Sequence, residues 1–136
     1  MRDLGKLFGE FKGGPGASEV AIAECERHFG LKLPRDYRDF MMSSNGGEGF
    51  IGPNSYLRLW EIEKLPLMND GYETAKYLPN GLLFGTDGGE EAFGFDLRTS
   101  QIKIVQVPFI GMEWKHAWLL SDSFNGFLHQ LYEAQM

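Results

Sequence analysis

The sequence predicts an α+β domain in which a mostly antiparallel sheet is flanked by helices. Apolar residues with helical spacing occur towards both ends of the 136-residue chain, whereas short apolar runs separated by turn residues fill its middle. Short strands joined by short turns pair antiparallel, and helices segregated from them pack on the sheet. We therefore expect about four helices and five or six strands. A chain of this length can bury a sufficient core without disulfides, and it has one cysteine.

Residues 1–17 are expected to form an N-terminal segment that precedes a single domain over residues 18–136. The segment contains five glycines and ends in the linker Gly13-Gly14-Pro15-Gly16. Apolar residues at positions 4, 7, 8 and 11 have the spacing of one side of a short helix. The segment therefore either docks on the domain or frays, as chain ends often do.

The first helix of the domain is predicted to begin after Ser18, a good N-cap residue, and to end at Gly30. Its inward residues are expected to be Ile22, Cys25 and Phe29. A reactive thiol needs a positive neighbourhood or a helix N-terminus, and the position of Cys25 offers neither. We therefore expect Cys25 to be buried and structural.

The stretch from Leu33 to Gly52 predicts a second helix, a glycine stop and a strand. Pro34 is tolerated at a helix start because its missing N–H would be unpaired there. The apolar stripe of this helix consists of Tyr37, Phe40 and Met41. Its charged residues are expected to face water, namely Arg35, Asp36, Arg38 and Asp39. Asn45-Gly46-Gly47 tolerate left-handed backbone, so the chain can reverse into a strand at residues 48–51.

The middle of the chain predicts further strands and one more helix. Alternation over residues 56–60 predicts a strand. Residues 62–77 are expected to be helical in their later part, with an inner side formed by Leu67, Tyr72 and Ala75. Three short strands are then predicted over residues 82–86, 92–97 and 102–107.

The C-terminal part is expected to be irregular over residues 110–120 and to finish in a helix. Ser121 or Asp122 would cap this helix, whose inward residues are Phe124, Phe127, Leu128 and Leu131. Across the whole chain, the predicted core includes Ile22, Phe29, Tyr37, Phe40, Trp60, Phe124 and Phe127.

An ordered set of short motifs resembles the SUKH superfamily, which groups a fungal cell-wall-synthesis regulator of the SMI/KNR type with many bacterial immunity proteins. The motifs are Ile22, Glu26, Phe29 and Gly30; Leu33-Pro34, Asp36-Tyr37, Phe40 and Asn45-Gly46-Gly47; Leu82 to Gly85 and Asp87 to Glu90; Ser123-Phe124 and Phe127-Leu128. The resemblance extends over residues 18–133 and implies a sheet flanked by helices.

The sequence does not predict a catalytic, cofactor-binding or metal site. The histidines, His28, His116 and His129, are far apart in the sequence and lack the spacing of zinc ligands. Neither Gly46-Gly47 nor Gly88-Gly89 precedes the Lys-Ser or Lys-Thr of a phosphate-binding loop. We therefore expect no cofactor and favour a protein without catalytic activity.

The negative charge is concentrated in the second half of the chain. Residues 1–68 carry nine basic and ten acidic residues, whereas residues 69–136 carry four basic and nine acidic residues. Such a field repels nucleic acid and anionic membranes and attracts a basic protein, although it also serves solubility. The candidate partner-binding residues are Asp87, Glu90, Glu91, Asp96 and Trp114. The carboxylates lack the alternate spacing of a calcium loop.

The resemblance to the SUKH superfamily implies an immunity protein that binds and neutralises a cognate toxin domain. We expect that domain to be basic, as in a nuclease, and expect a cytoplasmic location because the N-terminus lacks a signal-peptide pattern. A regulatory scaffold that resembles the fungal protein is an alternative. A small enzyme is a further alternative, in which the carboxylates of the hairpin at Asp87 converge in space with Glu48 or His116. The oligomeric state stays open.

Overall fold

The computed structural model describes residues 10–134, which form one seven-stranded antiparallel sheet and five α-helices. The strands are β1 (Lys12–Gly13), β2 (Gly47–Ile51), β3 (Ser55–Leu59), β4 (Gly81–Thr86), β5 (Glu91–Asp96), β6 (Lys103–Pro108) and β7 (Trp118–Ser121). The α-helices are α1 (Glu19–Phe29), α2 (Arg35–Ser43), α3 (Leu65–Gly71), α4 (Thr74–Tyr77) and α5 (Phe124–Glu133), and the short 3-10 helices are η2 (Ile62–Lys64) and η3 (Trp114–His116). The predicted α+β class is confirmed, with more strands than the five or six expected.

Strands β1 and β7 are the two that the sequence did not indicate. Strand β1 has only two residues and lies within the glycine-rich linker, where it pairs with β2. Strand β7 lies in the segment expected to be irregular and pairs with β6. The short helix considered for the N-terminus falls almost entirely on residues 1–9, outside the described part of the chain.

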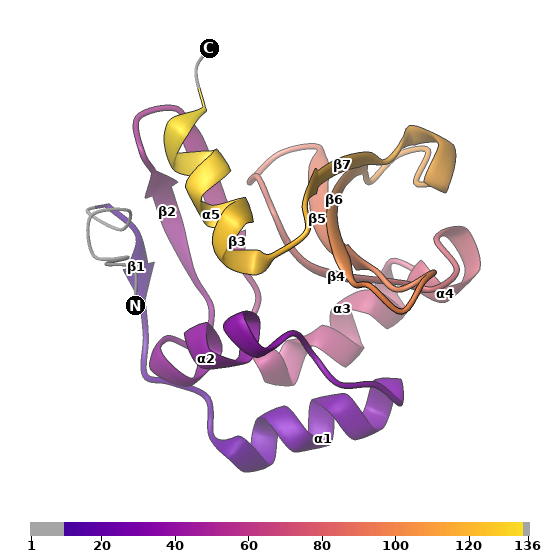
Figure 1. The fold of residues 1–136 in the computed structure, drawn as a ribbon, viewed down its shortest axis with the longest axis horizontal. Coiled ribbons are helices and arrows are strands. Elements are labelled where there is room, and N and C mark those ends of the chain that lie inside the picture. The colour runs from indigo at the N-terminus through magenta and orange to yellow at the C-terminus, as the bar shows by residue number, and fades with distance from the viewer. Residues whose placement is uncertain (1–9, 135–136) are drawn as a thin grey trace.

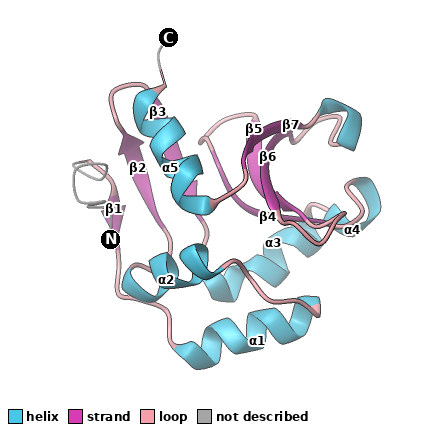
Figure 2. Cartoon of the chain, in the orientation of Figure 1, coloured by secondary structure: helices cyan, strands magenta, loops and turns pink. Residues whose placement is uncertain are grey.

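The sheet follows the chain order from β1 to β7 and divides into two parts of different orientation. Figures 1 and 2 show β2 and β3 on one side, the curled strands β4 to β7 on the other, and α5 in front between them. Helices α1, α2 and α3 lie below the sheet in this view. Two residue pairs join β3 to β4, Arg58 with Thr86 and Leu59 with Gly85, and Trp60 N–H donates to the carbonyl oxygen of Phe84 at 3.1 Å just beyond them. The sheet alone therefore couples the two parts weakly.

A cluster of aromatic rings fills the space between the helices and the sheet. The buried ring of Tyr37 from α2 has its centroid 5.7 Å from Phe84, 5.0 Å from Phe95 and 5.1 Å from Phe124. Phe84 also contacts Phe127 of α5 at 5.6 Å. These rings therefore join α2, β4, β5 and α5 in one core.

Most residues expected in the core are buried, and Phe29 differs. Those that are buried are Ile22, Tyr37, Phe40, Trp60, Phe124 and Phe127. Phe29 is half-buried against the edge of the core because it is the last residue of α1. Ser18 caps α1 and Gly30 ends it in the left-handed conformation with φ of 70°, as the sequence predicted.

Asp36 does not face water freely, in contrast to the expectation for the polar side of α2. Its Oδ2 atom accepts a hydrogen bond of 2.9 Å from the backbone N–H of Asn125 in the first turn of α5. Ser123, rather than Ser121 or Asp122, supplies the N-cap of α5 by accepting a bond of 3.0 Å from Gly126 N–H. Two side chains therefore satisfy N–H groups that the helix itself leaves unpaired.

The inner side predicted for residues 62–77 is wrong. Leu67 is 71% exposed and Tyr72 and Ala75 are also exposed. The segment is divided into η2, α3 and α4, with Glu73 in the left-handed conformation between the last two. One helical period therefore cannot extend through it, and its buried residues are Ile62, Leu65, Asn69 and Thr74.

Buried Asn69 links α3 to the irregular centre of β4. Its Oδ1 atom accepts from Leu83 N–H at 2.8 Å, and its Nδ2 atom donates to the carbonyl oxygens of Leu83 and Leu65 at 2.9 Å. The β4–β5 register shifts between Leu83 and Gly85. The side-chain amide of Asn69 therefore serves the backbone N–H and carbonyl groups of Leu83 as a hydrogen-bond partner in place of a neighbouring strand, beside this irregularity.

We predict that Tyr37→Phe leaves the free energy of unfolding unchanged or raises it by about 1 kcal/mol, because the buried hydroxyl oxygen of Tyr37 has no hydrogen-bond partner among residues 10–134. Tyr37→Ala should lower the same quantity by about 3 to 5 kcal/mol, since it opens a cavity among the aromatic rings. Urea denaturation measures both. A loss above about 1 kcal/mol for Tyr37→Phe would mean that the hydroxyl is paired in solution.

Candidate binding surface

Strand β5 separates the acidic residues selected from the sequence into two groups. Asp87, Glu90 and Glu91 lie at the turn where β5 begins, and Asp96 ends the strand. Five residue steps along a strand span roughly 16 Å, so Asp96 is remote from Glu91. Trp114 lies near Asp96, because Arg98 contacts both side chains.

Asp96 and Trp114 already bind other side chains and backbone groups of the protein. Arg98 donates to Asp96 through Nε at 3.0 Å and through Nη2 at 2.9 Å. The guanidinium carbon of Arg98 lies 3.8 Å from the centre of the Trp114 ring, and Trp114 Nε1 donates to the carbonyl oxygen of Pro79 at 2.8 Å. Burial raises the pKa of Asp96, but the hydrogen bonds from Arg98 outweigh it and hold the pKa below its usual value. These side chains therefore fix the local fold.

The β4–β5 turn is shaped by Asp87 and leaves two carboxylates for other partners. Asp87 Oδ1 accepts from the backbone N–H groups of Gly89 at 2.8 Å and Glu91 at 3.3 Å. Glu90 is exposed, and half-buried Glu91 accepts a bond of 3.3 Å from the amide of Gln106. Within residues 10–134, neither Glu90 nor Glu91 forms an ion pair. Their negative charges are therefore not neutralised locally.

A groove of about 450 Å³ lies beside this turn. Its lining combines aromatic, acidic and amide side chains, namely Phe50, Tyr56, Asp87, Gln106, Gln130 and Leu131. The turn packs directly on one aromatic wall, because a Cβ atom at Gly88 would lie 2.8 Å from the ring of Tyr56. Phe50 is 42% exposed and contacts Tyr56 edge-on at 5.3 Å. We refer to Glu90, Glu91, Phe50 and Tyr56 around this groove as the acidic-aromatic surface.

Glu48 holds the outer face of the β2–β3 hairpin next to these rings. The Tyr56 hydroxyl donates to Glu48, and Arg58 Nη2 donates to the same carboxylate at 3.2 Å. The bond from Tyr56, together with that from Arg58, lowers the pKa of Glu48. Glu48 is therefore ionised at neutral pH and fixes the ring of Tyr56 in place.

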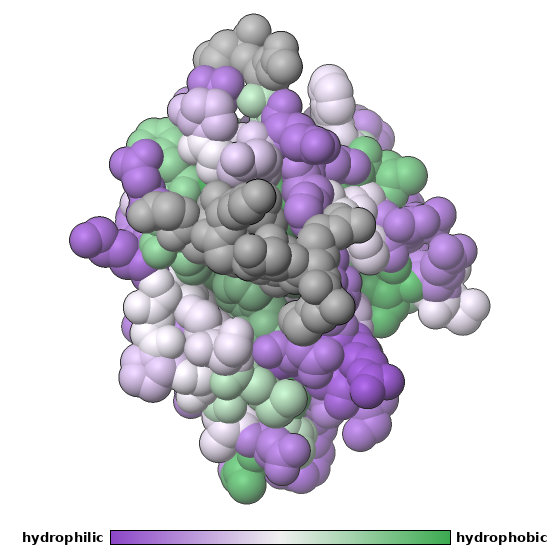
Figure 3. Space-filling view, turned by 60° about the vertical axis from the view of Figure 1, so that its left-hand side comes forward, coloured by the Kyte–Doolittle hydropathy of each residue, from purple (hydrophilic) through white to green (hydrophobic). Residues whose placement is uncertain are grey.

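Figure 3 shows hydrophobic residues in separate patches among hydrophilic ones on one side of the molecule.

The residues considered for a small enzyme have other roles in the structure. Asp87 forms the turn and Glu48 is bound by Tyr56 and Arg58, as described above. His116 Nδ1 donates to the carbonyl oxygen of Gly111 at 2.8 Å, in the connection from β6 to β7. In the part of the chain that is described, no group of three or more His, Cys, Asp or Glu is placed to hold a metal ion.

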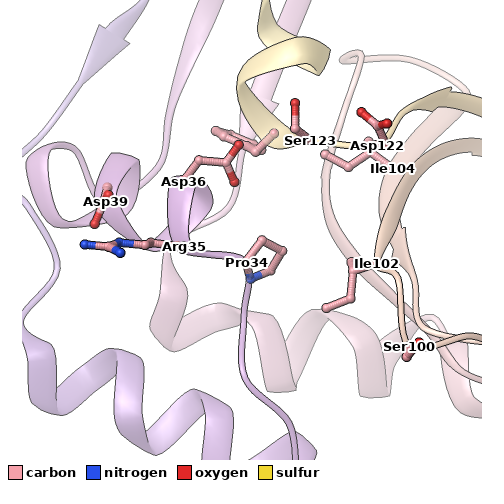
Figure 4. Close-up of a pocket in the computed structure, with 10 residues that line it drawn as sticks. Pro34, Arg35, Asp36, Asp39, Ser100, Ile102, Ile104, Asp122 and Ser123 are labelled. Carbon is pink, nitrogen blue, oxygen red and sulfur yellow. The ribbon is translucent and has the colours of Figure 1, made fainter. Parts of the chain in front are cut away.

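A second hollow, of about 570 Å³, lies where α2 and α5 begin. Figure 4 shows Asp36, Asp122 and Ser123 near its α5 side and Ile102 and Ile104 on its β6 side. Asp36 and Ser123 already accept backbone N–H groups of α5. Two polar groups at the centre of this hollow therefore serve helix capping, which makes it a weaker candidate than the acidic-aromatic surface.

The exposed aromatic and aliphatic residues at β7 were missed by the sequence analysis. Trp118 is 71% exposed and Leu119 is 63% exposed, whereas Trp114 is half-buried. Trp118 lies opposite Gln106, a residue of the groove. No local pattern distinguishes the two tryptophans, because their exposure depends on how β7 pairs.

We predict that the Cys25 thiol reacts with a disulfide reagent only on unfolding. Burial, followed by the nearby negative charges of Glu26 and Glu63, raises the pKa of Cys25 to about 11. The unfolded chain releases this proton near pH 9.0 while the folded chain retains it, so the free energy of unfolding should fall by up to about 2 kcal/mol as pH rises from 9.0 towards 11. Alkaline urea titrations of the wild type and Cys25→Ala measure the difference. Equal pH slopes would contradict the expectation.

The comparisons with known proteins agree with this fold. The model of the SMI1 / KNR4 family (SUKH-1) matches residues 16–130, which is most of the chain. The search of curated proteins finds no significant match. None of the helices within residues 10–134 has the length and apolar character required to cross a membrane.

Proposed function

Because the chain belongs to the SMI1 / KNR4 family (SUKH-1), we propose that it is a non-catalytic immunity protein that binds and neutralises a cognate bacterial toxin domain. The observation that carries the proposal is the acidic-aromatic surface, where Glu91, a carboxylate without an ion pair in residues 10–134, bonds to a residue of a groove that is also lined by exposed Phe50 and half-buried Tyr56. This combination is what a protein-binding surface requires, since charge guides encounter and buried rings supply affinity.

The charge of the surface favours a basic partner. Glu90 and Glu91 have no ion pair within residues 10–134, and the whole chain carries a net charge of −6. Opposite charges raise association rates through long-range attraction. Nucleases bind phosphates through basic clefts, so a nuclease toxin domain has the charge that this surface complements. Such a partner would be met in the cytoplasm, where the toxin acts.

The aromatic part of the surface is suited to binding because it is already ordered. Tyr56 is held by its bond to Glu48 and by the backbone at Gly88, and Phe50 packs edge-on against Tyr56. Rings that are fixed before binding lose little conformational entropy in the complex. Phe50 and Tyr56 are therefore the proposed anchor residues, and Glu90 and Glu91 the proposed steering residues.

We predict that a toxin domain is encoded beside this protein, that co-expression of the two rescues bacterial cells, and that the purified pair forms a one-to-one complex. Rescue should need binding but no turnover, so the complex should form without any change in the covalent structure of the toxin. Colony counts and the intact mass of both chains measure the two outcomes. Failure to rescue, or covalent modification of the toxin, would contradict the proposal.

We predict that Glu90→Lys combined with Glu91→Lys slows association with that toxin domain at least tenfold at low salt and has a small effect at high salt, because the interaction is screened. The free energy of unfolding should fall by no more than about 1 kcal/mol, because the substitutions break no ion pair in residues 10–134 and remove one hydrogen bond, from Gln106 to Glu91. The matched control is Glu24→Lys with Asp70→Lys, which makes the same charge change at exposed positions of α1 and α3. Stopped-flow kinetics across a salt series measures the rates. Equal association rates for the two double variants would mean that the β4–β5 turn is not part of the interface.

A further inference from the structure

The groove of the acidic-aromatic surface lies between the β2–β3 connection and the last turn of α5. Leu131 and Ala134 line it from the side of α5. The two elements touch, because a Cβ atom at Gly52 would lie 2.5 Å from the carbonyl oxygen of Tyr132, and Figure 1 shows the end of α5 beside this connection. The carbonyl end of a helix carries a partial negative charge, and the last turn of α5 contains no basic residue. This end of the groove is therefore suited to a cation that α5 does not itself supply.

Three side-chain amides line the groove, and each turns its nitrogen towards an acceptor of this protein. Asn54 Nδ2 donates to the carbonyl oxygen of Ala134 at 3.1 Å. Gln106 Nε2 donates to the Glu91 carboxylate at 3.3 Å, and Gln130 Nε2 donates to a backbone carbonyl oxygen of β7. These acceptors have no hydrogen to donate, so the bonds fix which way each amide is turned. Within residues 10–134, the three amide oxygen atoms accept no hydrogen bond.

Asp87 adds a carboxylate oxygen to the same lining. Its Oδ1 atom accepts from the backbone N–H groups of Gly89 and Glu91, whereas Oδ2 accepts no hydrogen bond within residues 10–134. The polar atoms that remain open along the groove are therefore mainly acceptors. Among protein side chains, only those of lysine and arginine carry several donors and no acceptor. The hydrogen-bonding pattern thus selects a basic side chain.

The aromatic wall favours arginine over lysine. Phe50 offers a 42% exposed ring beside Tyr56. A planar guanidinium stacks on a ring while its fork of N–H groups reaches several acceptors, whereas an ammonium is a compact and strongly hydrated charge. This protein already contains one such contact, because Arg98 lies 3.8 Å from the centre of the Trp114 ring and donates twice to Asp96.

We propose that the groove receives an arginine side chain of the protein partner. Its guanidinium group lies against Phe50, donates to Asp87 and to the amide oxygen atoms, and faces the carbonyl end of α5. The inference rests on the proposed function, because the arginine belongs to the protein that the acidic-aromatic surface binds. It adds the one side chain that this partner has to present.

An NMR titration of the full chain tests the inference without the toxin domain. The probe is N-acetyl-arginine methylamide, and N-acetyl-lysine methylamide is its control with the same charge. The arginine probe should shift the side-chain amide signals of Asn54, Gln106 and Gln130, and it should bind about fivefold or more tightly than the lysine probe. Equal affinities, or shifts that leave these three amides unmoved, would overturn the inference.

A conservative variant isolates the acceptor at Asp87. Asp87→Asn can still accept from Gly89 N–H, but it replaces the open oxygen by an NH₂ group that needs an acceptor of its own. The dissociation constant of the arginine probe should rise about tenfold, because a charged hydrogen bond is lost. Glu24→Gln removes the same charge from an exposed position of α1 and should leave the constant unchanged. An unchanged constant for Asp87→Asn would contradict the inference.

A second variant, Phe50→Leu, removes the ring at an exposed position without touching the β4–β5 turn. It should weaken the arginine probe about threefold or more and the lysine probe less, because stacking favours the planar group. Equal losses for both probes would count against the arginine.

Capture of the toxin domain separates this inference from the proposed function. A toxin domain that binds the wild type, Asp87→Asn and Phe50→Leu equally well would support the proposed function and overturn the arginine inference. A groove that binds the arginine probe selectively while the protein neutralises no toxin domain would contradict the proposed function and leave the preference for a guanidinium standing.

Discussion

The contact of the Tyr37 ring with Phe84, Phe95 and Phe124 is the interaction on which the rest of the structure depends. The two parts of the sheet share two residue pairs between β3 and β4 and one further backbone hydrogen bond beyond them, so backbone hydrogen bonds alone hold them weakly. The rings add edge-on aromatic contacts and the burial of several large side chains, which dominate core energetics. Helices α2 and α5 are thereby fixed against the sheet, and Asp36 joins them a second time at the start of α5.

The geometry of the acidic-aromatic surface follows from that core. Strands β4 and β5 are anchored by Phe84 and Phe95, so the turn between them projects at a fixed place. Gly88 allows this turn to approach the ring of Tyr56, where any Cβ atom would collide. Asp87 holds this turn by accepting a hydrogen bond from the backbone N–H of Gly89. The protein thus uses buried rings for rigidity and keeps free carboxylates for its surface.

The sequence predicted those features that neighbouring residues determine. Ser18 and Gly30 delimit α1 by local capping, and short apolar runs between turn residues identified β4, β5 and β6. Features that depend on distant partners were not predictable: Asp36 caps a helix 89 positions away, and Asn69 is buried because it bonds to Leu83. For the candidate site, the acidic turn was found from its composition. The engagement of Trp114 by Arg98 and the exposure of β7 depend on tertiary pairing, which no local pattern encodes.

The central claim is that this protein acts by presenting a rigid, preformed surface to a basic protein partner. Hydrogen–deuterium exchange of the free chain and of its complex with the proposed toxin partner tests it most directly. The account predicts new protection confined to the β2–β3 hairpin and residues 87–91, with α1 and the aromatic core unchanged. Protection centred on the hollow between α2 and α5, or spread through the core as in folding on binding, would contradict it.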